Sequence, residues 1–250
     1  MILKIPSFEK YPFHQQDLIR SKILEIINET FIFSADSDYI TARFLSLNHI
    51  HRPFFWPALQ ALEKYLKANL LLYGESVKRY GHDIVTMARV LEKYDRVIKD
   101  LPLIPNKMHE ELEKLSLWGS TDIGKFLHSI KQFGDVSNRY NFYGSEYKAS
   151  YLFKLDQVVY ALRTNVIGDE VLYDLRKRDS LSYYAYEQNA CFAPQGYQHQ
   201  AMYGKIGISM SVPTLEAALK GLYGHQHLFE TWLKDNMQIK VSEIKKIKKR

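Results

Sequence analysis

The sequence of 250 residues is short of cysteine, proline and glycine, with one, eight and twelve of them. A single cysteine, Cys191, cannot form an internal disulfide, which excludes a disulfide-framed secreted module. No run approaches the roughly 18 uncharged apolar residues that a membrane-spanning helix requires. Within the first 16 residues, an early proline and the charges of Glu9 and Lys10 interrupt the stretch where a signal peptide needs an unbroken apolar run. We therefore expect a cytoplasmic protein with no membrane association.

The chain has little excess charge outside its last residues, although its formal net charge is +6. Residues 240–250 hold six basic side chains and one acid, and they account for most of that excess. The remainder is nearly neutral, which argues against a broad basic face that would steer polyanions. The sequence therefore predicts a neutral body with a short basic tail.

Apolar residues, 46% of the chain, recur mostly at three- and four-residue steps, which is typical of amphipathic helices. Asp36-Ser37-Asp38 reads as a capping cluster that opens a helix, and Gly74 reads as a C-terminal cap. The helix at 52–73 could begin as late as Trp56, because two prolines fall in its first turns. The predicted helices span 17–28, 36–48, 52–73, 83–98, 106–116, a segment from 121 or 122 onward, 146–164, 213–223 and 225–239.

The pattern predicts an all-α fold with three parts. Residues 1–166 form a helical bundle, 167–239 form a mainly helical extension packed on it, and 240–250 form the basic tail. Strict alternation within 203–212 predicts one short strand in the extension. Residues 181–200 are aromatic, polar and poorly periodic, and fit a strand, a lid or an irregular segment equally.

Three short motifs follow one another between residues 55 and 140. Residues 58–68 read A-x-Q-A-x-E-K-x-L-K-A, and the pair His82-Asp83 then opens a second helix. Asn138-Arg139-Tyr140 lies in a loop bounded by glycines. In this order the motifs resemble those of HEPN domains, which are helical bundles associated with nucleotides and RNA. The resemblance is closest over 55–98, extends to about 165 and does not reach further.

The resemblance implies a homodimer that binds a nucleotide or RNA without performing chemistry on it. It also implies a place in stress response, defence or a toxin–antitoxin-like pair, with a nucleotidyltransferase-type protein as partner. No cofactor is expected. The binding residues that the resemblance implies are Lys64, Lys67, His82, Asp83, Arg139 and Tyr140.

A metal-independent ribonuclease is the alternative, because catalytic HEPN proteins carry an Arg-x4–6-His motif. Its histidine activates a ribose hydroxyl, and its arginine stabilises the charge that develops on the phosphate. No histidine follows Arg139 before His199, and the Arg43-x5-His49 match precedes the signature helices, which weighs against an enzyme. The catalytic candidates are Arg43, His49, Arg139 and Tyr143. A second alternative is a non-catalytic dimerisation or interaction scaffold.

A purely structural role is the alternative to the binding and catalytic roles of the candidate residues. Glu63 and Lys67 have the spacing of an ordinary ion pair on a solvated helix face. His82-Asp83 also fits a plain helix start, because an acid there complements the helix dipole. Pairs such as His49-Ile50-His51 lack a nearby third ligand, so no metal site is predicted.

Overall fold

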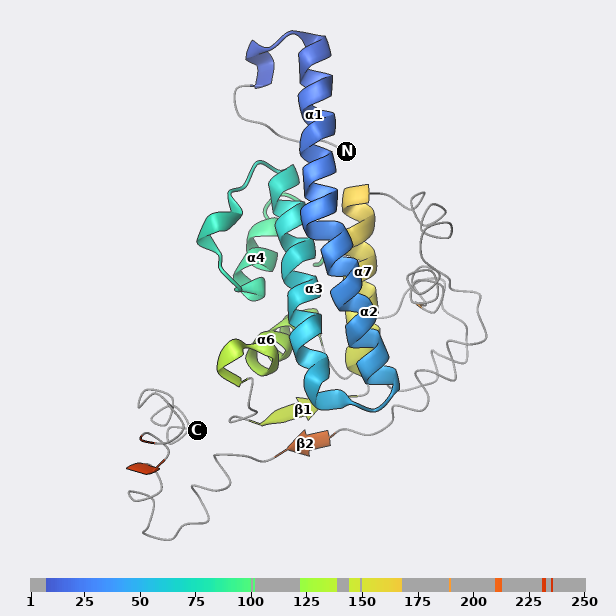
Figure 1. The fold of residues 1–250 in the computed structure, drawn as a ribbon, viewed down its shortest axis with the longest axis vertical. Coiled ribbons are helices and arrows are strands. Elements are labelled where there is room, and N and C mark those ends of the chain that lie inside the picture. Colours follow the sequence, from blue (N-terminus) through green and yellow to red (C-terminus); the bar gives the residue numbers. More distant parts are fainter. Residues whose placement is uncertain are drawn as a thin grey trace.

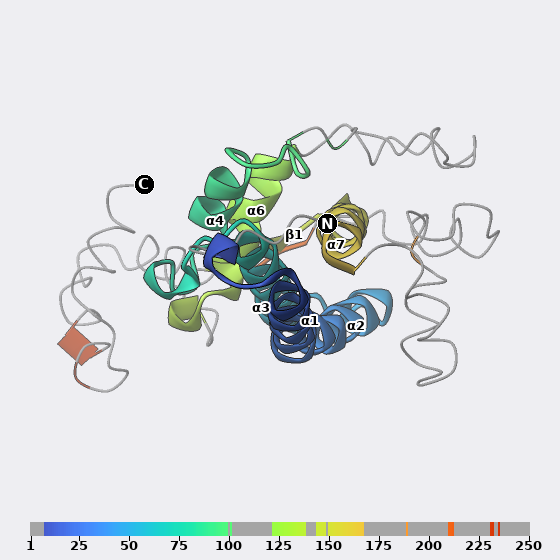
Figure 2. The same ribbon diagram turned by 90° about the horizontal axis from the view of Figure 1, so that it is seen from above.

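The structure is a computed structural model that describes residues 8–99, 101, 122–138, 144–148, 150–167, 189, 210–212, 231, 232 and 235. Within these residues the protein is an all-α helical bundle, which confirms the predicted fold class (Figures 1 and 2). The predicted helices at 106–116, 213–223 and 225–239, the segment 181–200 and the tail 240–250 lie wholly or mostly outside the described residues.

The N-terminal part of the bundle is one nearly continuous helix preceded by a short 3-10 turn, η1 (Phe8–Lys10). Helix α1 (Phe13–Ile27) passes through a π-helical turn, η2 (Asn28–Ile32), into α2 (Phe33–Leu47). The predicted break with a cap at residues 36–38 is therefore wrong. Asp36 is buried inside α2, where its carboxylate binds a guanidinium instead of the start of a helix.

Helix α3 (His51–Leu72) is the central element and packs against α2, α4, α6 and α7. It matches the predicted 52–73, and Gly74 follows it with a positive φ of 78°, as a C-terminal glycine cap requires. The late start at Trp56 is wrong, because α3 already includes Pro53 in its first turn, where a missing N–H costs little.

Helix α4 (Ile84–Leu91) begins where predicted and ends seven residues earlier than predicted. After it, Tyr94 stacks on Tyr73 with ring centroids 5.4 Å apart and donates to the carboxylate of Glu75. The Tyr73 hydroxyl in turn donates to Asp95 at 2.6 Å. These contacts hold the chain after Leu91 against the C-terminal end of α3, just before the short turn η3 (Val77–Arg79).

The last described helices are α6 (Ile123–Gly134) and α7 (Ser150–Ile167). Of the two predicted starts of α6, 121 and 122, the second is correct, because Asp122 caps the helix. Between them lie the turn η4 (Val136–Asn138) and strand β1 (Ser145–Tyr147). The predicted helix start at 146 is therefore wrong. Residues 145–147 instead pair antiparallel with β2 (Met210–Val212), which falls within the predicted strand at 203–212.

The last residue of α6, Gly134, packs closely against the N-terminal part of α3. A Cβ on Gly134 would lie 2.4 Å from the carbonyl oxygen of Phe55, so only glycine allows the two backbones to approach this closely. Residues Tyr151, Leu155, Val158, Val159 and Leu162 of α7 are all buried, as their helical spacing predicts.

Candidate functional site

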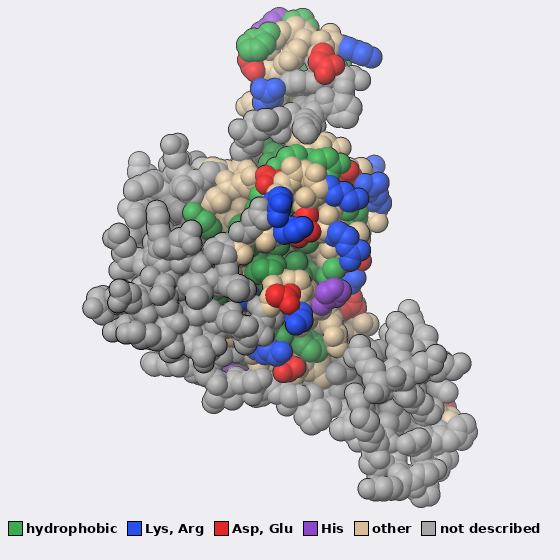
Figure 3. Space-filling model, turned by 180° about the vertical axis from the view of Figure 1, so that it is seen from behind, with side chains coloured by type: hydrophobic (Ala, Val, Ile, Leu, Met, Phe, Trp, Pro, Cys, Tyr) green, Lys and Arg blue, Asp and Glu red, His purple; other side chains and the backbone are tan. Residues whose placement is uncertain are grey.

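Ionisable side chains from α3, from the turn before α4 and from α6 meet on one side of α3. We call the five residues Glu63, Lys67, His82, Asp83 and Lys131 the charge cluster. Ion pairs join them into two groups that are linked through the peptide bond between His82 and Asp83. Figure 3 shows basic, acidic and histidine side chains interspersed on one face of the bundle rather than gathered by sign.

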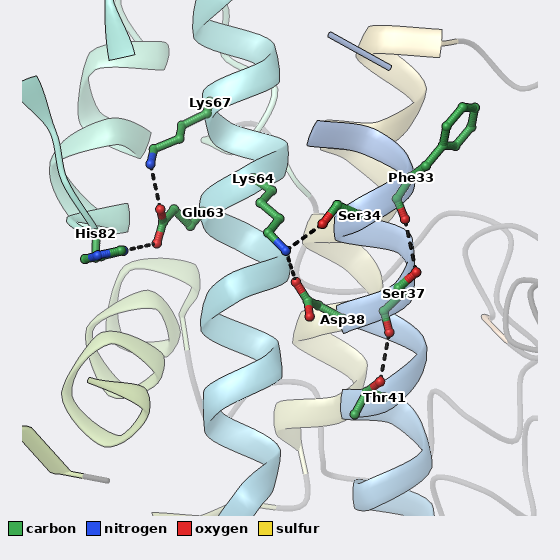
Figure 4. Close-up of polar contacts among 9 residues, drawn as sticks. All are labelled: Phe33, Ser34, Ser37, Asp38, Thr41, Glu63, Lys64, Lys67 and His82. Carbon is green, nitrogen blue, oxygen red and sulfur yellow. Dashed lines mark hydrogen bonds and ion pairs between the residues drawn. The ribbon is translucent and has the colours of Figure 1, made fainter. Parts of the chain in front are cut away.

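Glu63 is the centre of the first group and is only 6% exposed as a side chain. One carboxylate oxygen accepts from the Lys67 Nζ at 2.6 Å, and the other contacts the His82 Nδ1 at 2.6 Å (Figure 4). Since the carboxylate accepts, Nδ1 carries a proton and Nε2 is the ring nitrogen left for other partners. The His82 side chain is 66% exposed, so a buried acid holds an imidazole that solvent and ligands can reach.

Asp83 is the centre of the second group and caps α4. Its carboxylate accepts from the backbone N–H and the hydroxyl of Thr86, each at 3.0 Å, and pairs with the Lys131 Nζ at 2.8 Å. Partial burial would raise the pKa of Asp83, but the bonds from Lys131 and Thr86 prevail and lower that pKa from 3.8 to about 2. The helix-start reading of this residue is therefore confirmed.

Lys64 does not belong to the charge cluster, although the HEPN resemblance groups it with Lys67. Its Nζ lies toward α2, 2.8 Å from the Ser34 hydroxyl and 2.5 Å from the Asp38 carboxylate (Figure 4). Lys67 instead pairs with Glu63 of its own helix (Figure 4). Lys64 thus ties α3 to α2, whereas the ion pair of Lys67 lies within α3.

Arg139, Tyr140 and Tyr143 lie outside the described residues, so their distance from the charge cluster is not part of the site's geometry. The residue before them, Asn138, is buried, and its amide donates to the carbonyl oxygens of Phe133 and Gly144 at 3.2 Å and 3.0 Å. Asn138 therefore draws together the two ends of the loop that carries the Arg-Tyr pair.

Arg43 and His49 have separate surroundings. The Arg43 guanidinium is buried and forms an ion pair with Asp156, which is itself fully buried. His49 is exposed in the left-handed region at φ 61°, with its ring edge-on to His51 at 5.8 Å. No hydrogen bond or ion pair joins Arg43 to His49 among the described residues. A guanidinium enclosed with a carboxylate is poorly placed to stabilise a phosphate, so this geometry does not favour a ribonuclease pair.

The sequence analysis did not predict two features of the structure. Lys131 completes the charge cluster from α6, and no motif marks it. The second is a buried network between α2 and α7, in which Asp36 pairs with Arg163 and Arg43 pairs with Asp156. Its signal is present in the sequence as opposite charges seven residues apart in each of the two helices.

The described residues hold no group of three or more His, Cys, Asp or Glu side chains placed to bind a metal ion. His51, which belongs to one of the His-x-His pairs, is stacked on Tyr147 with centroids 4.1 Å apart. Burial, together with the neighbouring His49, lowers the pKa of His51. Among the helices of the described ranges, none is long and apolar enough to cross a membrane.

Comparison with protein-family models, curated proteins and solved structures gives no match to this chain.

Proposed function

We propose that this protein is a HEPN-like helical bundle that binds the phosphate groups of a nucleotide or an RNA at the charge cluster without cleaving them. The observation that carries the proposal is the exposed imidazole of His82, held at Nδ1 by the buried carboxylate of Glu63. A carboxylate in this position fixes the orientation of the ring and leaves Nε2 toward solvent, and a protonated ring can donate its Nε2–H to an anion.

The lysines beside His82 support an anionic ligand of limited charge. Lys67 and Lys131 are each paired with a carboxylate, so with His82 protonated the charge cluster has one net positive charge. Such a site suits one phosphate group held in a defined orientation better than a long polyanion bound by charge alone. The proposal therefore favours a nucleotide or an RNA end over an extended RNA duplex.

The wider role rests on the motifs alone. From the HEPN resemblance we infer a homodimer that acts in stress response, defence or a toxin–antitoxin-like pair beside a nucleotidyltransferase-type partner. An interaction scaffold without a ligand is the second candidate. The carboxylate partner of each lysine favours it, since these ion pairs also stabilise the bundle without a ligand.

Fluorescence anisotropy with a labelled oligoribonucleotide, and competition by ATP, tests the proposal. We expect His82→Ala and Lys67→Met each to weaken binding about tenfold, which is the loss of one charge-assisted hydrogen bond. Lys64→Met is the matched control, because Lys64 lies on the same helix and contacts α2 instead. Equal effects of Lys64→Met and Lys67→Met, or no binding by a folded wild type, would support the scaffold.

Incubation of the same RNA with the protein in EDTA tests the absence of cleavage. We expect intact RNA with the wild type, because Arg43 is enclosed with Asp156. Cleavage that is lost in Arg43→Ala, His49→Ala or Arg139→Ala would establish the ribonuclease and contradict our proposal.

A further inference from the structure

His51 is the first residue of α3, at the end of the bundle where β1 and β2 pair (Figure 1). The residue is only 9% exposed, and its Nδ1 has no hydrogen-bond partner among the described residues. A buried polar atom without a partner costs free energy and is uncommon in folded proteins. An imidazole in such a place is tolerated best in its uncharged form.

The ring of His51 belongs to an aromatic cluster around Tyr147 of β1. It stacks on the Tyr147 ring with centroids 4.1 Å apart, and Phe54 meets the same tyrosine edge-on at 5.2 Å. The Tyr147 hydroxyl hydrogen-bonds to the Ser46 hydroxyl of α2 at 2.5 Å. Tyr147 is 1% exposed, so these contacts fix β1, and through it β2, to α2 and α3.

We propose that His51 is a pH-sensitive switch that controls how firmly the β1–β2 pair is held on the bundle. Above pH 6.5 the uncharged ring stays stacked on Tyr147, and the two strands remain attached. When the ring takes up a proton it turns out to water, Tyr147 loses its stacking partner, and the strands detach more often. This switch is independent of the charge cluster and of the proposed function.

Protonation would place a positive charge and a second N–H donor on a ring that is poorly placed to hold them. Burial disfavours the charged form, and the N-terminal end of a helix of 22 residues repels a cation through the helix dipole. His49, edge-on at 5.8 Å, is a second group that can become positive. The stack on Tyr147 favours a cation only modestly. Burial first, and His49 second, lower the pKa of His51 from 6.5.

The charged groups on the elements around this ring offer it no carboxylate. On β1, Glu146 and Lys148 lie 3.8 Å from each other. On α2, Arg43 is paired with Asp156 of α7, and Arg52, the next residue of α3, is exposed and basic. The described residues of β2 carry no ionisable side chain. No ion pair with the histidine is present among the described residues, so nothing there compensates its charge.

The sign of the pH dependence follows from the lowered pKa. The uncharged ring stabilises the attached state fully above pH 6.5, the ordinary pKa of a histidine that is released to water. This contribution is lost as the pH falls below that value, because the detached state then binds the proton more readily. Each unit of pH below 6.5 raises the detached fraction by up to about tenfold.

Amide hydrogen exchange of the full chain at pH 7.5, 6.5 and 5.5, corrected for the intrinsic effect of pH, tests the switch. We expect the protection of the β1 and β2 amides to fall by about three- to tenfold from pH 7.5 to pH 5.5. Amides in the middle of α3 should keep their protection. His51→Phe retains an aromatic ring that cannot titrate, and is expected to abolish the fall.

His49→Asn is the matched control, because asparagine tolerates the positive φ of this position and leaves His51 in place. We expect it to keep most of the fall in protection. Protection of the strands that does not change with pH in the wild type, or that falls in His51→Phe as in the wild type, would overturn the proposal.

Nuclear magnetic resonance titration of the His51 ring in the wild type is a second test, which depends on no variant. We expect a pKa below 6.5. A ring that titrates at or above 6.5 would also overturn the proposal, since the attached state would then bind the proton as readily as the detached one.

Discussion

At the scale of single residues, Asp83 has two roles, of which the sequence predicts only one. It caps α4 and it binds Lys131 of α6, and it directly follows the exposed His82 in the chain. The cap is predictable from the residue type and its place before an apolar run. The ion pair to α6 depends on how two helices pack and has no local signal.

We expect Asp83→Ala to lower the free energy of unfolding by about 1 kcal/mol at neutral pH, because α4 loses its cap. The pKa of Asp83 is about 2 in the folded state, below its ordinary 3.8. Its ionised form therefore stabilises the fold above pH 3.8, and this contribution is lost as the pH falls through 2. Urea unfolding at several pH values should show the difference between wild type and variant shrinking from pH 4 to pH 2. The exposed Asp17→Ala serves as control, and a difference independent of pH would contradict the assignment.

At the scale of elements, two buried ion pairs of opposite order join α2 to α7. Asp36 of α2 binds Arg163 of α7, and two turns further along, Arg43 of α2 binds Asp156 of α7. The helices run antiparallel, so a shift of either helix by one turn would separate both pairs. Tyr65 of α3 also donates to Asp36 at 2.5 Å, which links the central helix to the same network.

We expect Arg43→Met to destabilise the bundle by about 3–5 kcal/mol, because it leaves the carboxylate of Asp156 buried without its cation. The double variant Arg43→Met with Asp156→Leu removes both charges and should be more stable than Arg43→Met alone. Chemical unfolding monitored by circular dichroism measures both changes. If the double variant loses as much unfolding free energy as the two single variants together, the two residues do not act as a pair.

At the scale of the whole molecule, residues far along the chain return to the bundle at two places. Strand β2 pairs with β1 at the end where α3 begins. Asn189 is fully buried, and its amide donates to the Tyr39 hydroxyl at 2.7 Å and to the Asp156 carbonyl oxygen at 3.1 Å. The bundle therefore uses polar groups from beyond residue 167 to complete its α2–α7 network.

We expect Asn189→Ala to destabilise the whole bundle by about 1–3 kcal/mol, because two buried acceptors lose this donor. The exposed Asp235→Ala should change the free energy of unfolding by less than about 0.5 kcal/mol. Thermal unfolding followed by the helical signal measures both. A bundle as stable in Asn189→Ala as in the wild type would show that the contact is not needed for folding.

The helical spacing of apolar residues was enough to predict α3, α6, the buried face of α7 and the all-α class. Sequence reasoning failed at Asp36, where a carboxylate of a type that often caps helices is instead buried beside Arg163. It failed again at residues 145–147, where a helical pattern gave way to pairing with a strand more than 60 residues away. In both places an interaction with a residue far away in the sequence outweighed the local structural preference. No local sequence pattern predicts which distant residue will make that interaction.

The candidate site divides in the same way. The sequence by itself determined that Glu63 and Lys67 share a helix face and that Asp83 opens a helix, because both depend on spacing within a few residues. Only the tertiary structure decided that Glu63 contacts His82, that Lys131 pairs with Asp83, and that Lys64 contacts α2. These contacts depend on how α2, α4 and α6 pack around α3, and that packing is set by the whole buried core.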